Sequence, residues 1–520
     1  MSGAVRAARV FPEPRRSFPW LSRRFVTESG LRLDFLCVGL LLTLTAAMLL
    51  PGALTLPLEL WDESRNAVNA LEMVTGGDWI VTRFAGQPDL WNTKPPLLTW
   101  IVAALLGAGL EPVVAIRLPA ILATMGSVTL IYVACRTMAR DRLAGLFGGL
   151  FAIASVLFMG DHAGRTGDFD ALLTCFNLGF VLSVGRYIDA DRDRSGRWIA
   201  VAAALLVLAV MTKGVAGGLA VPGLLAYAIA RRRVMAVLSD WRLWLSVFGA
   251  GAVLGVWFAA REHSGPGYLA AMWANDMGGR MATALDDHVE GPFYYLQILA
   301  VSVQPAILLS PALFLVWRDP DPARRRLCLL MLLTVASWLL LLTTARTKLY
   351  WYVVPTVPLL AIAVGVATTT LLRRSGTAIK SGTILRPLGF ALLLIFWYQN
   401  IREPREESPY APDQVWYGPF LNDLRGHARL DGAAIVDGGL ANGAGFANYN
   451  PVALFYTQDA ARRGEHIRLA VAGTRFEPGT IVVTCDPIER ARLRANPLFV
   501  SIRETSRCLA GYDRPSPMVR

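Results

Sequence analysis

The sequence predicts a polytopic α-helical membrane protein with about eleven transmembrane helices that ends in a small α/β domain. Hydrophobic residues make up 54% of the 520 positions and charged residues only 17%, and the mean hydropathy is +0.43. A soluble chain of this length rarely has such values. The apolar residues form blocks, such as residues 35–50 and 199–210, rather than an alternating pattern. Blocks of this kind favour transmembrane helices over a barrel.

Residues 1–33 form a basic tail before the first apolar block. No small-residue cleavage site follows a short apolar core, so we expect a cytoplasmic tail and an uncleaved first span rather than a signal peptide. The net charge of +12 is compatible with nucleic-acid binding. However, the basic residues lie in short clusters between apolar blocks, where they orient a membrane protein. We therefore expect no nucleic-acid partner.

The positions of the basic clusters fix the expected topology. With the tail inside, the spans alternate so that the Arg-rich loops at 136–142, 186–197 and 318–326 all face the cytoplasm. The apolar stretch 97–110 must then be interfacial or re-entrant, because a further span would invert every later loop. The transmembrane domain covers 34–399, with spans expected near 34–55, 113–135, 143–160, 170–188, 198–212, 215–230, 243–260, 294–316, 326–343, 350–371 and 384–399.

The outer side receives a first loop at 56–112, a long loop at 261–293 and everything after residue 400. Beyond residue 400 the hydropathy drops and short apolar runs alternate with polar stretches, which predicts a small α/β domain over 400–520. Cys485 and Cys508 lie in this region and can form a disulfide in an oxidising compartment. The other cysteines fall in or beside apolar blocks and have the character of small buried hydrophobes.

The first outer loop is dense in functional groups. Asp62 and Glu63 adjoin a span end, and Arg65 lies about one helical turn beyond Asp62. A carboxylate held at a membrane surface beside cations can act as a general base or orient a sugar hydroxyl. The alternative is that Asp62 caps the following helix, with Ser64 as the competing cap. Spacing alone does not separate these two interpretations.

A second outer segment, residues 161–170, again places acids immediately before an apolar block. Asp170 has either a chemical role or the simpler role of a first-turn acid that complements the helix dipole, and for Asp168 the simpler role is favoured. His162 has no partner at metal-ligand spacing, so we interpret it as a solvated loop histidine.

Lys213 and Lys348 interrupt outer span boundaries. Such lysines usually extend their ammonium groups to the membrane surface. Cations are otherwise scarce near the outer span ends, however, and lysine is a good point-charge partner for phosphate. These residues therefore predict a pocket for a lipid phosphate, lined by Arg65, Lys94, Arg165, Lys213, Arg346, Lys348 and Tyr350.

A possible divalent cation site lies in the long outer loop, where Asp287, His288 and Glu290 offer oxygen and nitrogen ligands. Acidic clusters in loops are more often simply solvated, so the sequence leaves the metal open.

The motifs occur in a specific order along about residues 34–371: Asp62-Glu63-x-Arg65, Gly77-Asp78-Trp79, Lys94-Pro95-Pro96, Arg117-Leu118-Pro119, Arg165-x4-Asp170-Ala171-Leu172-Leu173-Thr174, Thr212-Lys213-Gly214, Gly291-Pro292-Phe293-Tyr294-Tyr295-Leu296 and Thr347-Lys348-Leu349-Tyr350. This ordered set resembles the bacterial aminoarabinose transferase family, which is related to the protein O-mannosyltransferases and has the GT-C membrane fold. Each motif alone is weak, but the order is specific.

The resemblance implies a glycosyltransferase of the bacterial inner membrane whose active site faces the periplasm. It implies a sugar donor linked to polyprenyl phosphate and an acceptor that is lipid A, core oligosaccharide or another envelope glycan. The matching positions imply catalytic roles for Asp62 and Asp170 and donor-phosphate contacts for Arg65, Lys94, Lys213 and Lys348. We add Arg165 and Tyr350 to the phosphate group, assign Glu63 and Asp168 to the sugar or acceptor, and expect a monomer.

The implied donor sets the expected chemistry. Its leaving group already carries charge, so cations around the phosphodiester can stabilise the transition state without a nucleotide or an obligatory metal cofactor. With a hydroxyl acceptor, Asp62 is the candidate base and a single displacement inverts the anomeric centre; a phosphate acceptor needs no strong base.

Two other classes of protein fit the sequence less well. A lipid or sugar transporter or flippase would carry mid-span charges and two related halves, whereas here the charges concentrate at one surface. A receptor whose C-terminal domain binds a ligand would leave the acidic first loop without a role.

Overall fold

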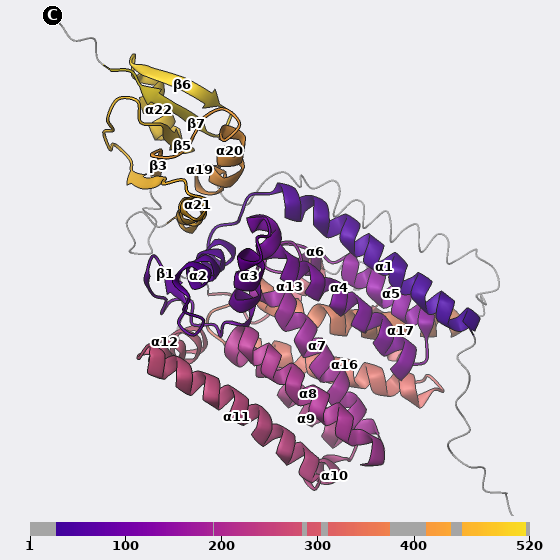
Figure 1. Cartoon of the computed structure of the whole chain (residues 1–520). Helices are drawn as coiled ribbons and strands as arrows, with labels where there is room; N and C mark the ends of the chain where they lie inside the picture. The colour runs from indigo at the N-terminus through magenta and orange to yellow at the C-terminus, as the bar shows by residue number, and fades with distance from the viewer. Residues whose placement is uncertain are drawn as a thin grey trace, which may run out of the picture.

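The computed structural model describes residues 28–190, 192–282, 289–302, 310–374, 412–437 and 450–515. It consists of an α-helical bundle with a smaller domain of helices and strands at one end (Figure 1). Within the described residues, seven helical segments are long and apolar enough to cross a membrane. The corresponding helices are α1 (Glu28–Thr55), α4 (Pro112–Met138), α7 (Phe169–Asp189), α8 (Arg192–Lys213), α11 (Trp241–Ser264), α16 (Pro322–Thr344) and α17 (Val357–Arg374).

The remaining expected spans are short, interrupted or outside the described residues. In place of 143–160 and 215–230, the structure has α5 (Arg142–Ile153) with α6 (Val156–Met159), and η1 (Gly214–Gly218) with α9 (Val221–Ala230). Of the expected span 294–316 it describes α13 (Tyr294–Ser302), η3 (Ser310–Ala312) and α15 (Leu313–Val316), and residues 303–309 lie outside the described residues. The expected span at 384–399 lies outside the described residues. A helix of 12 residues, such as α5, is about 18 Å long, less than the ~30 Å hydrocarbon core. Hydropathy measures how apolar a block is but not where its helix breaks.

Helix α5 is held inside the bundle by close packing on α17. A Cβ added at Gly365 would lie 2.4 Å from the carbonyl oxygen of Ala144, and one at Gly148 would lie 3.0 Å from the carbonyl oxygen of Ala361. Any larger side chain would push the two helices apart, which is why small residues occur where membrane helices approach closely. This contact is part of the main hydrophobic core.

The first outer loop folds into α2 (Asp62–Gly76), the paired strands β1 (Arg83–Phe84) and β2 (Gln87–Pro88), and α3 (Leu97–Gly107). Helix α3 has only 11 residues, too few to span a membrane, as the expected topology requires. Helix α2 starts after Trp61, whose positive φ of 73° turns the chain sharply. Trp61 occupies the N-cap position, without a side-chain capping hydrogen bond. The structure therefore gives no support to capping by Asp62 or Ser64.

The long outer loop contains α12 (Tyr268–Met272) and the π-helix η2 (Trp273–Met281). It lies against the first outer loop, because the Tyr268 hydroxyl donates to the carbonyl oxygen of Thr93 at 2.7 Å and the Asn275 amide donates to that of Trp91 at 3.3 Å. The Thr347 N–H donates to the carbonyl oxygen of Arg280 at 3.0 Å. This bond joins the long loop to the segment that precedes η4 (Tyr350–Thr356).

The C-terminal domain contains a five-stranded sheet with the order β4-β3-β5-β7-β6. Strand β3 is parallel to β4 and β5, whereas β7 is antiparallel to β5 and β6. A disulfide joins Cys485, after β5, to Cys508, before β7. The elements are α19 (Pro412–Val415), α20 (Tyr417–Leu424), β3 (Ala434–Asp437), α21 (Pro451–Arg462), β4 (Arg468–Val471), β5 (Val482–Thr484), α22 (Pro487–Ala495), β6 (Phe499–Glu504) and β7 (Leu509–Asp513).

Helix α21 attaches this domain to the first outer loop. The Gln458 amide donates to the Glu72 carboxylate of α2 at 2.6 Å, and the Arg462 guanidinium donates to the carbonyl oxygen of Leu106 in α3 at 2.8 Å. Buried residues of α2, α3, α20 and α21 belong to one hydrophobic cluster. The domain thus packs directly on the loop that carries Asp62 (Figure 1).

Candidate active site

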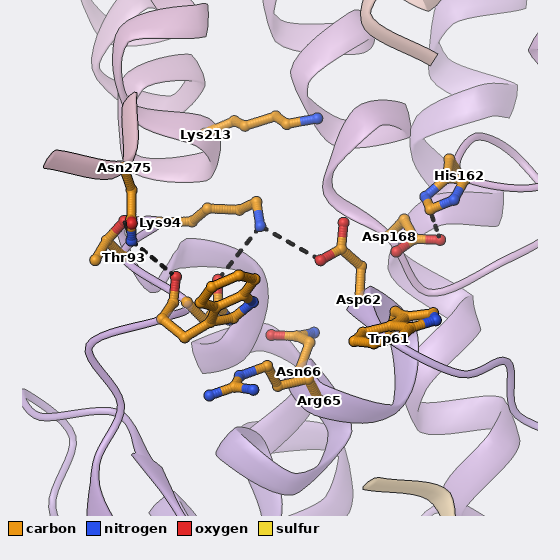
Figure 2. A network of polar contacts seen from close by, with 12 residues as sticks. Trp61, Asp62, Arg65, Asn66, Thr93, Lys94, His162, Asp168, Lys213 and Asn275 are labelled. Atoms are coloured by element: carbon orange, nitrogen blue, oxygen red, sulfur yellow. Dashed lines mark hydrogen bonds and ion pairs between the residues drawn. The ribbon is translucent and has the colours of Figure 1, made fainter. Parts of the chain in front are cut away.

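Asp62 and Lys94 face each other at the centre of the outer loops. The Lys94 ammonium lies 3.5 Å from Asp62 Oδ1, with the Asp62 side chain 33% exposed and that of Lys94 13% exposed. Lys94 also lies over the ring of Phe169, the first residue of α7, at 4.8 Å. Figure 2 shows this pair, with the Lys213 side chain above it. Through the contact of Lys94 with Phe169, the pair connects the first outer loop to the start of α7.

Several cations lie within electrostatic range of the Asp62 carboxylate. Burial raises the pKa of Asp62, but Lys94, His162, Lys213 and Arg280 outweigh burial and hold it well below its ordinary value. Burial lowers the pKa of Lys94, opposed by the neighbouring Asp62. Asp62 is thus an ionised carboxylate with several cations within electrostatic range.

Asp170 and Lys213 form a second ion pair beside the first. The Lys213 ammonium donates to both carboxylate oxygens of Asp170, at 2.7 and 2.6 Å, and lies 5.3 Å from the centre of the Tyr352 ring. The pair joins the first turn of α7 to the last turn of α8. Because both oxygens of Asp170 are engaged, this acid is less available to a substrate than Asp62.

Asp168 lies on the opposite side of Asp62 from Lys94, beside His162 (Figure 2). The Thr166 hydroxyl donates to Asp168 Oδ2 at 2.5 Å, and His162 Nδ1 lies 3.6 Å from the same oxygen. Asp168 Oδ1 is buried and has no hydrogen-bond partner among the described groups. Burial raises the pKa of Asp168 to about 6. Asp168 occupies the N-cap position of α7, but its side chain makes no capping hydrogen bond.

The interpretation of His162 as a solvated loop residue is wrong. Its ring stacks on Trp351 at 3.9 Å, and its side chain is only 12% exposed. Ligand atoms of Asp62, His162 and Asp168 lie within 4.8 Å of one another and could hold a metal ion. Spacing along the chain gave no signal of this group, because Asp62 comes from a different loop.

The sequence named three other candidate metal ligands. Glu290 is exposed, and Asp287 and His288 lie outside the described residues.

Glu63 does not face the space beside Asp62. It forms a buried ion pair with Arg117, in which Arg117 Nε lies 2.6 Å from Glu63 Oε1. Glu63 also accepts the N–H groups of Glu59 and Gly167, each at 2.7 Å. With its oxygens occupied in this way, Glu63 positions the loops, and its assignment to the sugar or acceptor is wrong.

Arg65 likewise has a supporting position. Its guanidinium donates to both oxygens of Asp89, at 2.9 and 2.8 Å, and Figure 2 shows it directed away from Asp62 and Lys94. Asp89 Oδ1 in turn accepts the N–H groups of Trp91 and Asn92 at 3.0 Å. The amide oxygen of Asn92 lies 3.5 Å from the Lys94 ammonium. Arg65 therefore orders the segment that presents Lys94 instead of adding a charge beside it.

The other expected phosphate contacts have partners of their own. The Lys348 ammonium donates to the carbonyl oxygen of Ala345 at 2.9 Å, and Arg165 Nε donates to Asp161 at 2.9 Å. Tyr350 packs edge-on against Trp351 at 4.9 Å and lies 6.0 Å from the His162 ring. Of the expected cations, Lys94 and Lys213 are therefore the two whose charges act together on Asp62.

The structure adds Arg280 and Asn66 to the site. Arg280 donates to Asp276 at 2.9 Å and is close enough to lower the pKa of Asp62. The Asn66 amide nitrogen is buried and has no hydrogen-bond partner in the described part of the chain, although its oxygen accepts from Thr99 at 2.7 Å. In the sequence, the available signal for Arg280 was an arginine in an outer loop near Asp276. No signal in the sequence marked Asn66.

The sequence is similar to those of known membrane transferases. Residues 93–257 match the family model described as dolichyl-phosphate-mannose-protein mannosyltransferase. An undecaprenyl phosphate-alpha-4-amino-4-deoxy-L-arabinose arabinosyl transferase of Pseudomonas aeruginosa (strain LESB58) is 31% identical over 375 residues, which cover 68% of this chain and 64% of the relative. The protein of the same name from Edwardsiella ictaluri (strain 93-146) is 28% identical over 369 residues, covering 66% and 62%.

The chain thus spans less than two thirds of the length of these relatives. The crystal structure of ArnT from Cupriavidus metallidurans bound to undecaprenyl phosphate superposes with a TM-score of 0.63 at 17% identity, over 93% of this chain and 98% of that one. This likeness shows a shared fold, and the family model covers the residues that carry Lys94, Asp170 and Lys213. The chain is therefore a multi-pass membrane protein that belongs to the aminoarabinose transferase-like family of GT-C glycosyltransferases, related to the protein O-mannosyltransferases.

Proposed function

We propose that this protein transfers a sugar from an undecaprenyl-type phosphate carrier to an acceptor at the outer face of the bacterial inner membrane. The observation that carries the proposal is the position of Asp62, which lies 3.5 Å from Lys94 and within electrostatic range of Lys213 and Arg280. Such a transfer needs a carboxylate that acts on the acceptor and, beside it, cations that bind the lipid phosphate.

The cations act on the leaving group. When the bond between the sugar and the phosphate breaks, negative charge grows on the phosphate oxygens. Lys94 and Lys213 are fixed by Asp62 and Asp170, so they need little reorganisation to meet that charge, and a preorganised cation lowers the barrier more than a mobile one. A divalent metal is not required for this step.

Asp62 acts on the acceptor. In the free protein its pKa is held low by the surrounding cations, which makes it a weak base. Binding of the donor phosphate gives those cations a competing anion, so the basicity of Asp62 rises when the donor is in place. Asp62 then accepts the proton of an acceptor hydroxyl, or orients that hydroxyl, as it attacks the anomeric carbon. We assign lipid A or another envelope glycolipid as the acceptor.

The orientation in the membrane follows from charge. Loops rich in arginine connect the helix ends opposite the candidate site, for example at residues 231–233 and 318–326, and such loops remain in the cytoplasm. The site, the first outer loop and the C-terminal domain are then periplasmic. The disulfide between Cys485 and Cys508 supports this side, because disulfides form in the periplasm and are rare in the cytosol.

The test is transfer by the purified protein in nanodiscs, supplied with undecaprenyl phosphate-linked 4-amino-4-deoxyarabinose and lipid A. We expect modified lipid A and free undecaprenyl phosphate in equal amounts, detected by mass spectrometry. Donor that crosses the bilayer of a reconstituted vesicle without cleavage of its sugar would indicate a flippase and overturn the proposal. Mass spectrometry of lipid A, core oligosaccharide and envelope glycans from a deletion strain then identifies the physiological acceptor.

A further inference from the structure

Two adjoining basic cavities lie at the end of the bundle opposite the candidate site. The first, of about 270 Å³, lies between the last turns of α4 and α7 and the first turns of α8 and α16, and is lined by Arg140, Arg186 and Arg326. The second, of about 540 Å³, contains Arg231 and Arg325 and shares Arg326 with the first. Arg326 therefore forms a wall common to both cavities.

The arginines of the first cavity have neutral contacts. Arg186 donates to the Thr137 hydroxyl and lies 4.6 Å from the centre of the Trp198 ring, while Arg326 Nε donates to the carbonyl oxygen of Pro322 at 3.2 Å. Among the described residues, neither of these arginines nor Arg140 forms an ion pair. With respect to the acids that the structure describes, their three charges remain available to an anion.

The acid that lines the first cavity is already neutralised. Asp189 Oδ1 accepts from Arg231 Nε at 2.8 Å, and Oδ2 accepts from the Tyr227 hydroxyl at 2.6 Å. Asp189 therefore cannot serve as the counter-ion of the three arginines without losing the partners that it has.

Three other arginines at the same end of the bundle are paired within the protein. Arg136 and Arg142 bind Asp34, at 3.1 and 2.7 Å. The buried Arg324 binds Asp141 and Asp319. The tendency of cytoplasmic loops to be basic explains why arginines are here, but it does not explain why three of them without an acidic partner converge on one cavity.

We propose that the paired cavities bind the headgroup of an anionic phospholipid with two phosphodiester groups, of the diphosphatidylglycerol class. Guanidinium groups match phosphate oxygens in charge and geometry, and basic pockets between transmembrane helices on the cytoplasmic side recognise such headgroups. The two cavities joined at Arg326 provide one place for each phosphate. Met138, Leu327 and Leu329 add apolar wall beside the arginines, which suits the start of the acyl chains.

The test uses the purified full-length protein in detergent. Native mass spectrometry and the thermal unfolding midpoint are measured after titration with diphosphatidylglycerol, phosphatidylglycerol, phosphatidylcholine and inorganic phosphate. We expect one diphosphatidylglycerol to bind at least tenfold more tightly than phosphatidylglycerol and to raise the unfolding midpoint, and we expect inorganic phosphate to leave both readings unchanged. Equal binding of phosphatidylglycerol would overturn the two-phosphate assignment, and saturation by inorganic phosphate would overturn the lipid assignment.

The variant Arg140→Gln/Arg186→Gln/Arg326→Gln removes the charges of the first cavity. Its matched control, Arg232→Gln/Arg233→Gln/Arg318→Gln, removes the same charge from residues outside both cavities at the same end of the protein. We expect the first variant to bind diphosphatidylglycerol at least tenfold more weakly and the control to retain its affinity. Equal losses of affinity in both variants would show that the effect comes from general surface charge and not from the cavities. Arg326→Gln alone, which affects the wall shared by both cavities, provides the same comparison if the triple variant does not fold.

Discussion

Glu63 and Arg117 lie 54 positions apart and form a bidentate ion pair, with Arg117 Nε 2.6 Å from Glu63 Oε1 and Nη2 2.8 Å from Oε2. Arg117 also donates to the carbonyl oxygens of Ala53, Leu56 and Pro57. Through the N–H of Gly167 the same carboxylate reaches the segment before α7. A single pair thus joins the end of α1, the start of α2, helix α4 and the loop that carries Asp168.

Replacement of Glu63 by Gln tests this connection. The amide keeps the size of the side chain but leaves the buried Arg117 guanidinium without its counter-ion, and removal of one partner of a buried pair costs about 3–5 kcal/mol. We expect a clearly lower unfolding midpoint in detergent and a parallel loss of transfer activity, because Asp62 precedes Glu63 directly. The control Glu72→Gln, at a partly exposed position of the same helix, should change the midpoint little. Equal stability of the two variants would show that the pair does not hold the loops together.

The donor-phosphate assignment predicts weaker donor binding when Lys94 or Lys213 is replaced by Met. Each change removes one charge-assisted hydrogen bond to the phosphate, worth about 1.5–3 kcal/mol, so the dissociation constant for undecaprenyl phosphate should rise about tenfold or more. The control Arg83→Gln removes a cation from the same outer loop, where Arg83 is partly exposed and paired with Asp78. Unchanged affinity in both lysine variants would place the phosphate elsewhere.

The sequence was sufficient to predict the class of fold and the loops that build the site, because hydropathy, basic loops and short motifs are local signals. It was insufficient for the partners of individual charges. Arg65 and Glu63 have the same character in the sequence as Lys94 and Asp62, yet their partners, Asp89 and Arg117, come from positions that only the folded chain brings close. Composition records how many charges a loop has, and three-dimensional pairing decides which of them remain available.

The prediction that His162 is solvated was wrong for the same reason. Alone in a loop, a histidine is expected to be solvated, but Trp351 covers one face of its ring and Asp168 lies beside it. The stacking partner is almost two hundred positions away, so no local pattern could reveal it. By contrast, Cys485 and Cys508 were predictable as a pair because a polar region with two cysteines leaves few alternatives.

Asp168 predicts a pH dependence of stability. Burial raises its pKa from 3.8 to about 6 in the folded protein, so between these values the folded state keeps a proton that the unfolded state releases. Its contribution to the free energy of unfolding therefore falls as the pH rises from about 4 to about 6, by at most about 3 kcal/mol. In Asp168→Asn the group is always neutral, so the variant should gain stability relative to the unmodified protein across this window and keep a constant difference above it. Parallel unfolding midpoints of the two proteins from pH 4.5 to 7.5 would show that Asp168 does not titrate in this way.

Replacement of Asp62 by Asn separates chemistry from donor binding. The amide has nearly the same size but neither accepts a proton nor carries the charge that orients an acceptor, so turnover should fall about a hundredfold or more. Loss of the carboxylate also frees Lys94 from its partner at 3.5 Å, so the affinity for undecaprenyl phosphate should stay the same or increase. Asp78→Asn, an acid of the same loop that pairs with Arg83, serves as the control and should retain near-normal turnover. Single-turnover transfer and donor binding are measured on the same preparations. Near-normal turnover in the Asp62→Asn variant would move the role of base to Asp170, which would then have to release Lys213 before it could act, because both of its oxygens accept from that ammonium.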